Sequence, residues 1–409
     1  MASASGKRRS WTIAAPLALL GLLVVISRAN PAPANAQPYV PQSGDEVLEK
    51  LAATVSDPWQ RASASVGRAA VVSGAKNSPL DAESAAARAR AELRSYQASA
   101  DPRFLGRAEA ALGEFWDQVS PPEPILVLRA RVRQSNHEFD TALKDLDQAL
   151  TVNPADDQAL LDRAGIETVV GRYDAAARDC RLLEPLTAPL YSTMCRAALS
   201  GVTGAAGKAD DELTHLLESP ALAPEDRCWV ESLLGELAVR IGQPGPAEQH
   251  YRSVLAVCPS DTYTRGALAD LLLDLDRPAE VAPLLADQTN QDALLLRLTI
   301  AEKRSGAKSF LAHLQDLTQR FDEARLRGNQ VHRREEARYE LVLRGRAEPA
   351  LTLSLANFRV QREPADVRIA LEAALSAAHP ERVQEVVAFV RASRLEDPHV
   401  AQLLTRLGQ

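Results

Sequence analysis

The residues best suited to covalent chemistry in this sequence are four cysteines, Cys180, Cys195, Cys228 and Cys258. Four thiols allow three disulfide connectivities. In an antiparallel pair of helices, residues at equal distances from the turn face each other. Cys180 and Cys195 flank, almost symmetrically, a turn that runs from Pro185 to Pro189. This spacing predicts a disulfide between Cys180 and Cys195.

The other two cysteines have the same relation to a second turn. Cys228 and Cys258 are each 15 residues from Gln243, which places them together at the open end of a helix hairpin. We therefore expect a second disulfide between Cys228 and Cys258, and closed loops this short stabilise a fold by about 3 kcal/mol each. The alternative is four buried free thiols, because Cys180 also fits a core position.

The remaining reactive residue types show no catalytic or metal-binding pattern. No C-x-x-C motif is present, and no histidine has another three or four residues away on the same helix face. The sequence also lacks the G-x-S-x-G, phosphate-loop and G-x-G-x-x-G motifs. Acidic runs such as 210–212 are typical of solvated helix faces. We therefore expect neither an enzyme nor a cofactor.

Composition indicates which elements carry these residues. The chain of 409 residues is 46% hydrophobic but only 4% aromatic, and alanine and leucine supply most of its apolar side chains. Both are strong helix formers and give few strand signals. We expect an all-α fold.

An internal repeat determines how these helices are arranged. Ala108, Ala142 and Ala176 are 34 residues apart, and each lies near the start of a similar helical segment. Later copies follow at Ala247 and Val281 with small insertions. A period of this length is typical of stacked helix hairpins.

The repeated segments resemble the tetratricopeptide repeat. That family combines a large and a small apolar residue in a first helix, a Gly or Asn turn, an aromatic, a further small residue and a closing Pro. The clearest copy, from Glu123 to about Asp156, has Leu126, Ala130, Phe139, Ala142, Leu146, Ala149 and Asn153-Pro154. Other copies have Leu160, Ala164, Gly171, Tyr173, Ala176 and Cys180, and Leu234, Gly235, Gly242, Ala247, Tyr251, Val254 and Pro259. Pro244 stands where the pattern has an aromatic residue.

The resemblance covers residues 81–409. It implies about eight or nine hairpins in a right-handed superhelix, with a concave groove lined by the first helices. Small residues such as Ala130 and Ala164 would let neighbouring helices pack closely. Proteins of this family bind other proteins, so the resemblance implies a protein partner.

The family's groove positions map onto eight residues of this chain: Arg131, Gln134, Thr168, Trp229, Glu236, Arg240, Tyr263 and Asp270. Trp229 and Tyr263 carry most weight, because aromatic residues supply much of the energy at interfaces. The alternative for both is packing between neighbouring hairpins. A separate charged stretch, residues 325–338, is expected to form a loop that leads into a solvated helix, and the alternative is a docking surface for a partner.

The N-terminal residues resemble a signal peptide. Lys7, Arg8 and Arg9 precede an apolar run from Trp11 to Ser27, and small residues end at Ala36. We expect residues 1–36 to be a signal peptide cleaved after Ala36, and residues 37–80 to be a Pro- and Ala-rich tether with a short helix. The alternative is an uncut signal anchor, which the positive charge of Arg28 favours.

Cleavage would change the net charge from −7 to −11. An acidic surface repels phosphate backbones, so nucleic acid is not an expected partner. We expect a periplasmic scaffold or adaptor that binds a peptide or helix of a partner protein in its groove. The alternative is an accessory subunit of an inner-membrane transport or secretion assembly, attached to the membrane only through its N-terminal segment.

Overall fold

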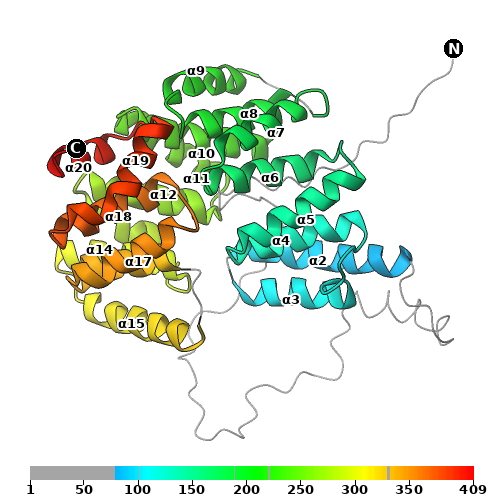
Figure 1. Ribbon diagram of the computed structural model, residues 1–409. Helices are drawn as coiled ribbons and strands as arrows, with labels where there is room; N and C mark the ends of the chain where they lie inside the picture. The colour runs from blue at the N-terminus through cyan, green and yellow to red at the C-terminus, as the bar shows by residue number, and fades with distance from the viewer. Residues whose placement is uncertain (1–78, 100, 188, 220–221, 329–331) are drawn as a thin grey trace, which may run out of the picture. The chain divides into compact units, whose positions relative to one another are not determined.

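The computed structural model describes residues 79–99, 101–187, 189–219, 222–328 and 332–409. Helices make up nearly all of these segments, and none of the described residues lies in a β-strand (Figure 1). The all-α prediction is confirmed. The expected signal peptide, its cleavage after Ala36 and the tether to residue 78 lie outside the described residues.

The chain begins its described part with α2 (Pro79–Ser99), α3 (Arg103–Leu112) and the short η2 (Gly113–Phe115). Eight hairpins follow among the described residues. The first four are α4 (Glu123–Ser135) with α5 (Phe139–Val152), α6 (Asp157–Val169) with α7 (Tyr173–Leu183), α8 (Pro189–Ser200) with α9 (Ala206–Leu217), and α10 (Pro224–Arg240) with α11 (Pro244–Val257).

The second four hairpins continue the same order. They are α12 (Thr262–Asp274) with α13 (Pro278–Leu285), α14 (Asp292–Ser305) with α15 (Phe310–Leu326), α16 (Arg333–Arg338) and the π-helix η3 (Tyr339–Leu343) with α17 (Ala347–Phe358), and α18 (Pro364–Ser376) with η4 (Pro380–Val383) and α19 (Gln384–Ser393). Helix α20 (Pro398–Arg406) ends the array. The predicted hairpin repeat is confirmed.

Each of the eight hairpins turns through one residue with positive φ. Five of these residues are glycines and three are not: His137, Gly171, Gly204, Gly242, Asp276, Gly306, Gly345 and Ala378. The following residue donates its backbone N–H back to the first helix, as Arg172 does to Glu167 over 2.7 Å. This hydrogen bond caps the carbonyls that a helix end leaves unpaired. The recurring turn therefore fixes the antiparallel hairpin in each repeat.

Small residues allow the helices of a hairpin to approach closely. Ala130, Ala142, Ala164 and Ala176 are at most 1% exposed, as their place in the repeat predicts. Gly235 of α10 lies directly against the ring of Tyr251 on α11, which leaves no room for a side chain. Close packing of this kind buries the face that each hairpin shares with its neighbours.

The hydrophobic core is divided along the chain. One cluster lies between Leu126 and Leu237, and a second between Ala238 and Leu343. A third cluster lies between Ala350 and Leu403. We call residues 347–409, which contain this third cluster, the C-terminal module.

Both expected disulfides are present. Cys180 on α7 pairs with Cys195 on α8, with their Cα atoms 5.5 Å apart, and thereby links two successive hairpins. Cys228 on α10 pairs with Cys258 at the end of α11, with a Cα separation of 6.6 Å. The connectivity predicted from the symmetry about each turn is confirmed.

Candidate functional site

The first helices of successive hairpins lie side by side, as shown by the contacts of α4 with α6, α10 with α12, and α12 with α14. Seven of the eight predicted groove residues are polar side chains on this row of helices: Arg131, Gln134, Thr168, Glu236, Arg240, Tyr263 and Asp270. We call the face that carries these seven residues the inner wall. All seven are buried or half-buried.

At the N-terminal end of the inner wall, an ion pair joins α4 to α6. Arg131 donates to the carboxylate of Asp162 over 2.8 Å, and Gln158 donates to the other oxygen of Asp162 over 2.9 Å. Burial raises the pKa of Asp162, and the Arg131 guanidinium opposes that shift. Gln134 and Thr168 are each 8% exposed, and the Thr168 hydroxyl donates to the Ala164 carbonyl.

In its middle the inner wall brings α10 and α12 together. The Tyr263 hydroxyl donates to the carboxylate of Glu236, which also pairs with Arg240 over 3.4 Å. Burial raises the pKa of Glu236, whereas Arg240 and Tyr263 act to lower it. The structure thus unites three predicted residues in one cluster.

Asp270 extends the row toward the C-terminus. Its carboxylate accepts hydrogen bonds from Arg297 on α14 and from Arg338 on α16, each over 2.6 Å. Burial acts to raise the pKa of Asp270, but the two guanidinium groups hold it well below its usual range. Sequence analysis did not identify either arginine as part of the site.

The charged stretch at residues 325–338 corrects one expectation. Its helix α16 is not a solvated helix, because Arg334 pairs with Glu363 over 2.9 Å and with the buried Asp366 over 3.4 Å. Burial favours a higher pKa for Glu335, yet the neighbouring Arg334 lowers it to about 2. The alternation of arginine and glutamate in this stretch indicates that it can form ion pairs. The repeat pattern does not show that the partners of Arg334 are Glu363 and Asp366, at the start of α18.

Trp229 is the one predicted groove residue that lies in the core. It is 4% exposed, belongs to the first hydrophobic cluster, and lies with its ring centroid 6.2 Å from that of Tyr191. It occupies the second turn of α10, where that helix packs against the preceding hairpin. Its role is therefore packing between hairpins, the alternative considered from sequence.

Two guanidinium groups on the inner wall have incomplete hydrogen bonding. Arg131 Nη2 and Arg240 Nη1 are buried atoms without an acceptor in the described part of the chain. The two side chains are only 12% and 11% exposed. Buried polar groups are nearly always paired, so each of these donors marks a position where an acceptor would be stabilised.

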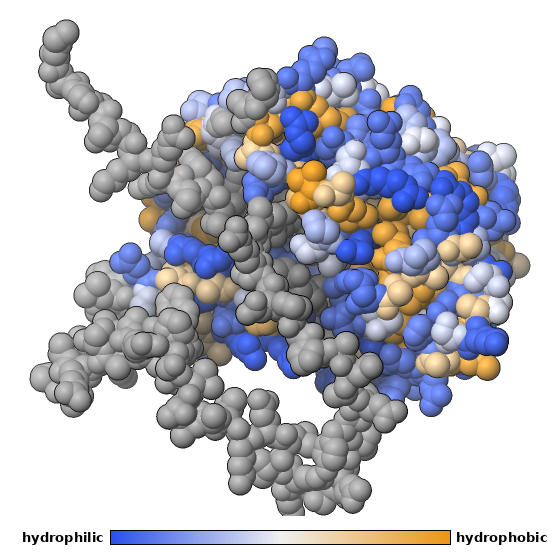
Figure 2. Space-filling model, turned by 180° about the vertical axis from the view of Figure 1, so that it is seen from behind, coloured by the Kyte–Doolittle hydropathy of each residue, from blue (hydrophilic) through white to orange (hydrophobic). Residues whose placement is uncertain are grey.

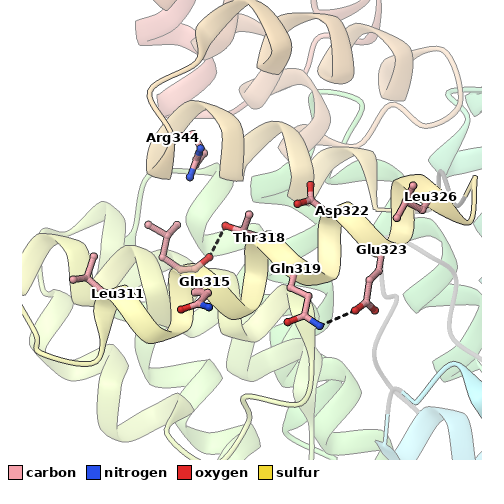
Figure 3. Close-up of a pocket in the computed structure, with 9 residues that line it drawn as sticks. Leu311, Gln315, Thr318, Gln319, Asp322, Glu323, Leu326 and Arg344 are labelled. Atoms are coloured by element: carbon pink, nitrogen blue, oxygen red, sulfur yellow. Dashed lines mark hydrogen bonds between the residues drawn. The ribbon is translucent and has the colours of Figure 1, made fainter. Parts of the chain in front are cut away.

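A separate hollow of about 490 Å³ lies on the surface along α15. Eight of its nine lining residues belong to α15, and Arg344 faces them from the neighbouring hairpin (Figure 3). Leu311 and Leu326, at its two ends, are 72% and 87% exposed. Because one helix supplies almost the whole lining, the hollow is a surface strip and not an enclosed pocket.

Elsewhere the visible surface is mixed. Figure 2 shows one face on which hydrophobic residues form patches among hydrophilic ones. Within the described residues, no group of three or more His, Cys, Asp or Glu is placed to hold a metal ion. Helices long and apolar enough to cross a membrane are likewise absent from that part of the chain.

Comparisons with known proteins give structural matches alone. No family model and no curated protein matches the sequence. Among solved structures, a tetratricopeptide repeat protein from Parabacteroides merdae ATCC 43184 is 15% identical, with a TM-score of 0.38 over 59% of this chain and 93% of that one. The Cut9–Hcn1 hetero-tetramer of APC/C gives 11% identity and a TM-score of 0.42 over 76% of this chain and 60% of that one. The P58(IPK) TPR domain gives 14% identity and a TM-score of 0.22 over 80% and 97%.

The chain's own geometry carries the assignment of the fold. Ala142 and Ala176, 34 residues apart, lie on the second helices of successive hairpins, whose first helices α4 and α6 lie side by side, and each of the eight hairpins has one left-handed turn residue. Small residues occupy the close contacts of these hairpins, as in the repeat pattern. The chain is a tetratricopeptide-repeat-like helical solenoid.

Proposed function

We propose that the chain is a periplasmic scaffold whose inner wall holds an acidic segment of a partner protein. The observation that carries this proposal is the pair of unpaired donors, Arg131 Nη2 and Arg240 Nη1, on one row of helices. Carboxylates are the strongest acceptors for guanidinium donors, and such charge-assisted hydrogen bonds gain strength where water is excluded. An extended segment with two acidic residues would satisfy both.

The neighbouring residues favour a protein ligand. Gln134 on α4 and Thr168 on α6 offer an amide and a hydroxyl group on the way from Arg131 to Arg240, and Tyr263 on α12 offers a hydroxyl group beyond Arg240. A peptide backbone presents carbonyl and amide groups that pair with such side chains. Repeat solenoids bind extended partners along the face that their repeats build together.

The cysteines support the proposed compartment. Both cystines are buried and join helices that the fold already brings together. Disulfides form and persist in oxidising compartments such as the periplasm. They agree with the signal-like residues 1–36, which lie outside the described part of the chain.

A photo-cross-linking experiment tests the inner wall. Tyr263 is replaced by azidophenylalanine in the native cell envelope, because this residue keeps the aromatic ring at the centre of the wall. We expect one dominant protein adduct whose yield falls at least tenfold when Arg240→Gln is added. Mass spectrometry of the adduct then reads whether the captured segment is acidic.

The matched control removes an arginine from outside the inner wall. Arg252→Gln on the second helix α11 breaks an ion pair with Glu248 at a half-exposed site and makes the same change in charge. The adduct yield should stay unchanged in this variant. Equal loss in both variants, or an adduct that forms equally from a probe at Gln249 on α11, would contradict the proposal.

The rival function, an accessory subunit of an inner-membrane transport or secretion assembly, differs at the N-terminus. An uncut apolar run from Trp11 to Ser27 would keep the scaffold at the membrane. N-terminal sequencing of the mature protein separates the two. A mature chain that starts at Gln37 excludes the anchor, and an intact N-terminus supports it.

A further inference from the structure

The C-terminal module has a hydrophobic cluster of its own, against which Leu341 of η3 also packs. Its hydrophobic cluster, from Ala350 to Leu403, is distinct from the two clusters of the preceding repeats. Helices α18 and α20 meet α12 at Asp274, far from them in sequence (Figure 1). The module meets the preceding hairpins through polar groups and through a few apolar side chains. Leu395 packs against a small cluster of Ala176, Leu199 and Val202, and Val360 packs against the first cluster.

The first contact is at the α6/α7 turn. Arg362 donates its backbone N–H to the carbonyl of Val169 over 2.7 Å, and its guanidinium lies over the ring of Phe389 at 5.5 Å. A Cβ atom at Gly171 would lie 3.0 Å from the Phe389 ring. The left-handed glycine of this turn thus meets the module directly.

The same arrangement recurs at the next two turns. A Cβ atom at Gly204 would lie 2.8 Å from the carbonyl oxygen of Arg394, and one at Gly242 would lie 3.4 Å from Pro398. Beside the first, Glu396 accepts the backbone N–H of Ala206 at the start of α9 over 3.2 Å. Three successive hairpin turns therefore share one covering surface.

An ion pair completes the contact at α12. Both carboxylate oxygens of Asp274 accept hydrogen bonds from Arg368 over 2.6 and 2.7 Å, and His399 lies 3.8 Å from the same carboxylate. A bidentate arginine–carboxylate pair is strong and depends on geometry. The two residues are 94 positions apart, so the pair holds the module to the middle of the array.

The module also carries a carboxylate, Glu363, which pairs with Arg334 over 2.9 Å and acts on residues of the inner wall. Glu363, just before α18, acts electrostatically on both Glu236 and Arg240, and burial raises its pKa. It also acts on Tyr263. The chain's own acid therefore lies near the residues to which the proposed function assigns an acidic partner.

We propose that the C-terminal module is an autoinhibitory latch, which closes over the hairpin turns at Gly171, Gly204 and Gly242 and over Asp274 of α12, and which opens to admit an acidic partner segment to the inner wall. This inference rests on the proposed function of that wall. Small rotations distributed over the hairpins from α12 to α17 would part the contact. The partner's carboxylate then pairs with Arg240, whose Nη1 lacks an acceptor among the described residues in the closed arrangement.

Hydrogen exchange tests the latch without a partner. The Arg362 amide reports closure directly, because its acceptor is the Val169 carbonyl across the contact. We expect Arg368→Gln, and separately Glu396→Gln, to speed exchange of this amide at least tenfold. Arg382→Gln, which removes an ion pair with Glu348 inside the module, should leave it unchanged.

A cysteine pair tests the opposite state. Gly242→Cys with Pro398→Cys puts a thiol on each side of the contact, where a Cβ atom at Gly242 would lie 3.4 Å from Pro398, and a disulfide between them should lock the module, with Pro398→Cys alone as control. Binding is measured with a fluorescent octaglutamate peptide, which should bind Arg368→Gln at least tenfold more tightly than the unaltered chain and should not bind the oxidised lock.

The outcomes separate the two proposals. Unchanged exchange at Arg362 in both release variants, or peptide binding to the lock equal to that of its control, overturns the latch. Faster exchange without peptide binding to any variant supports the latch and instead overturns the assignment of an acidic segment to the inner wall.

Discussion

His137 is the residue whose titration is most clearly linked to folding. It occupies the α4/α5 turn with a φ of 59°, and its ring stacks on Phe139 at 5.4 Å. Burial lowers the pKa of His137 from 6.5 to about 4, against the opposing charge of Glu335 and with smaller contributions from Arg334 and His332. The folded chain thus keeps this imidazole neutral at pH values where an unfolded chain would protonate it.

The sign of the pH dependence follows from this lowered pKa. Between pH 6.5 and about 4 the unfolded state binds more protons at His137, so stability falls as the pH falls through this window. The expected loss between pH 7 and pH 5 is about 2 kcal/mol. Urea unfolding of His137→Asn, whose side chain tolerates positive φ, should lack this part of the slope. His215→Asn, at an exposed site on α9, should keep the full dependence of the unfolding free energy on pH. Equal dependence on pH in the unaltered chain and both variants would contradict the assignment to His137.

Ala378 allows the turn conformation to be tested at a single residue. It has a φ of 56° in the α18/η4 turn, where a left-handed conformation costs an L-residue about 1 kcal/mol. We expect Ala378→Gly to raise the free energy of unfolding by about 1 kcal/mol in urea titration.

The reverse substitution, from glycine to alanine, tests the same turn conformation at another hairpin. Gly306 has a φ of 68° in the α14/α15 turn, and no atom lies within 4 Å of the position that a Cβ would take. Gly306→Ala should therefore lower stability by about 1 kcal/mol through backbone strain alone. A change of the same sign in both variants would exclude the turn conformation as the cause.

Hairpin packing is the element-scale property that the repeat encodes. Gly235 of α10 faces the Tyr251 ring of α11, whereas a Cβ atom at Gly207, near the start of α9, would have no heavy atom of a neighbouring element within 4 Å. Gly235→Ala should destabilise the protein by about 1–3 kcal/mol, because the ring cannot withdraw from a buried contact. Thermal or urea unfolding measures this loss.

The comparison with α9 isolates packing from helix propensity. Gly207→Ala makes the same chemical change in a helix with free space, and should raise stability by about 0.5–1 kcal/mol. Both substitutions gain helix propensity equally. A stabilised Gly235→Ala variant would show that α10 and α11 are not held in such close contact.

The elements were predictable because their signals are local. Helix α11 begins at Pro244, so the proline that replaces the expected aromatic residue serves as the first residue of the helix, where it needs no N–H acceptor. Helices α6 and α12 are capped by the side chains of Asp156 and Asp261. The disulfides followed because residues at equal distances from a turn must meet.

At the scale of the whole molecule, the site was only partly predictable. The inner-wall residues follow from their positions in the repeat, but their partners do not, because Arg338 reaches Asp270 across 68 residues and Glu396 reaches Ala206 across 190. Contacts of this separation depend on how small rotations accumulate over several hairpins. Trp229 was misplaced for a related reason: its neighbour Tyr191 belongs to another hairpin.

The two disulfides also set how the protein behaves under tension. A solenoid pulled from its ends gives way one hairpin after another, because each is held mainly by its neighbours. The cross-links bridge separations of 15 and 30 residues, which cannot extend until the sulfur bonds break. At about 3.4 Å per residue, the two loops closed by the disulfides contain about 15 nm of chain that cannot be extended while the disulfides are intact. The chain is therefore extensible at both ends and restrained in the middle.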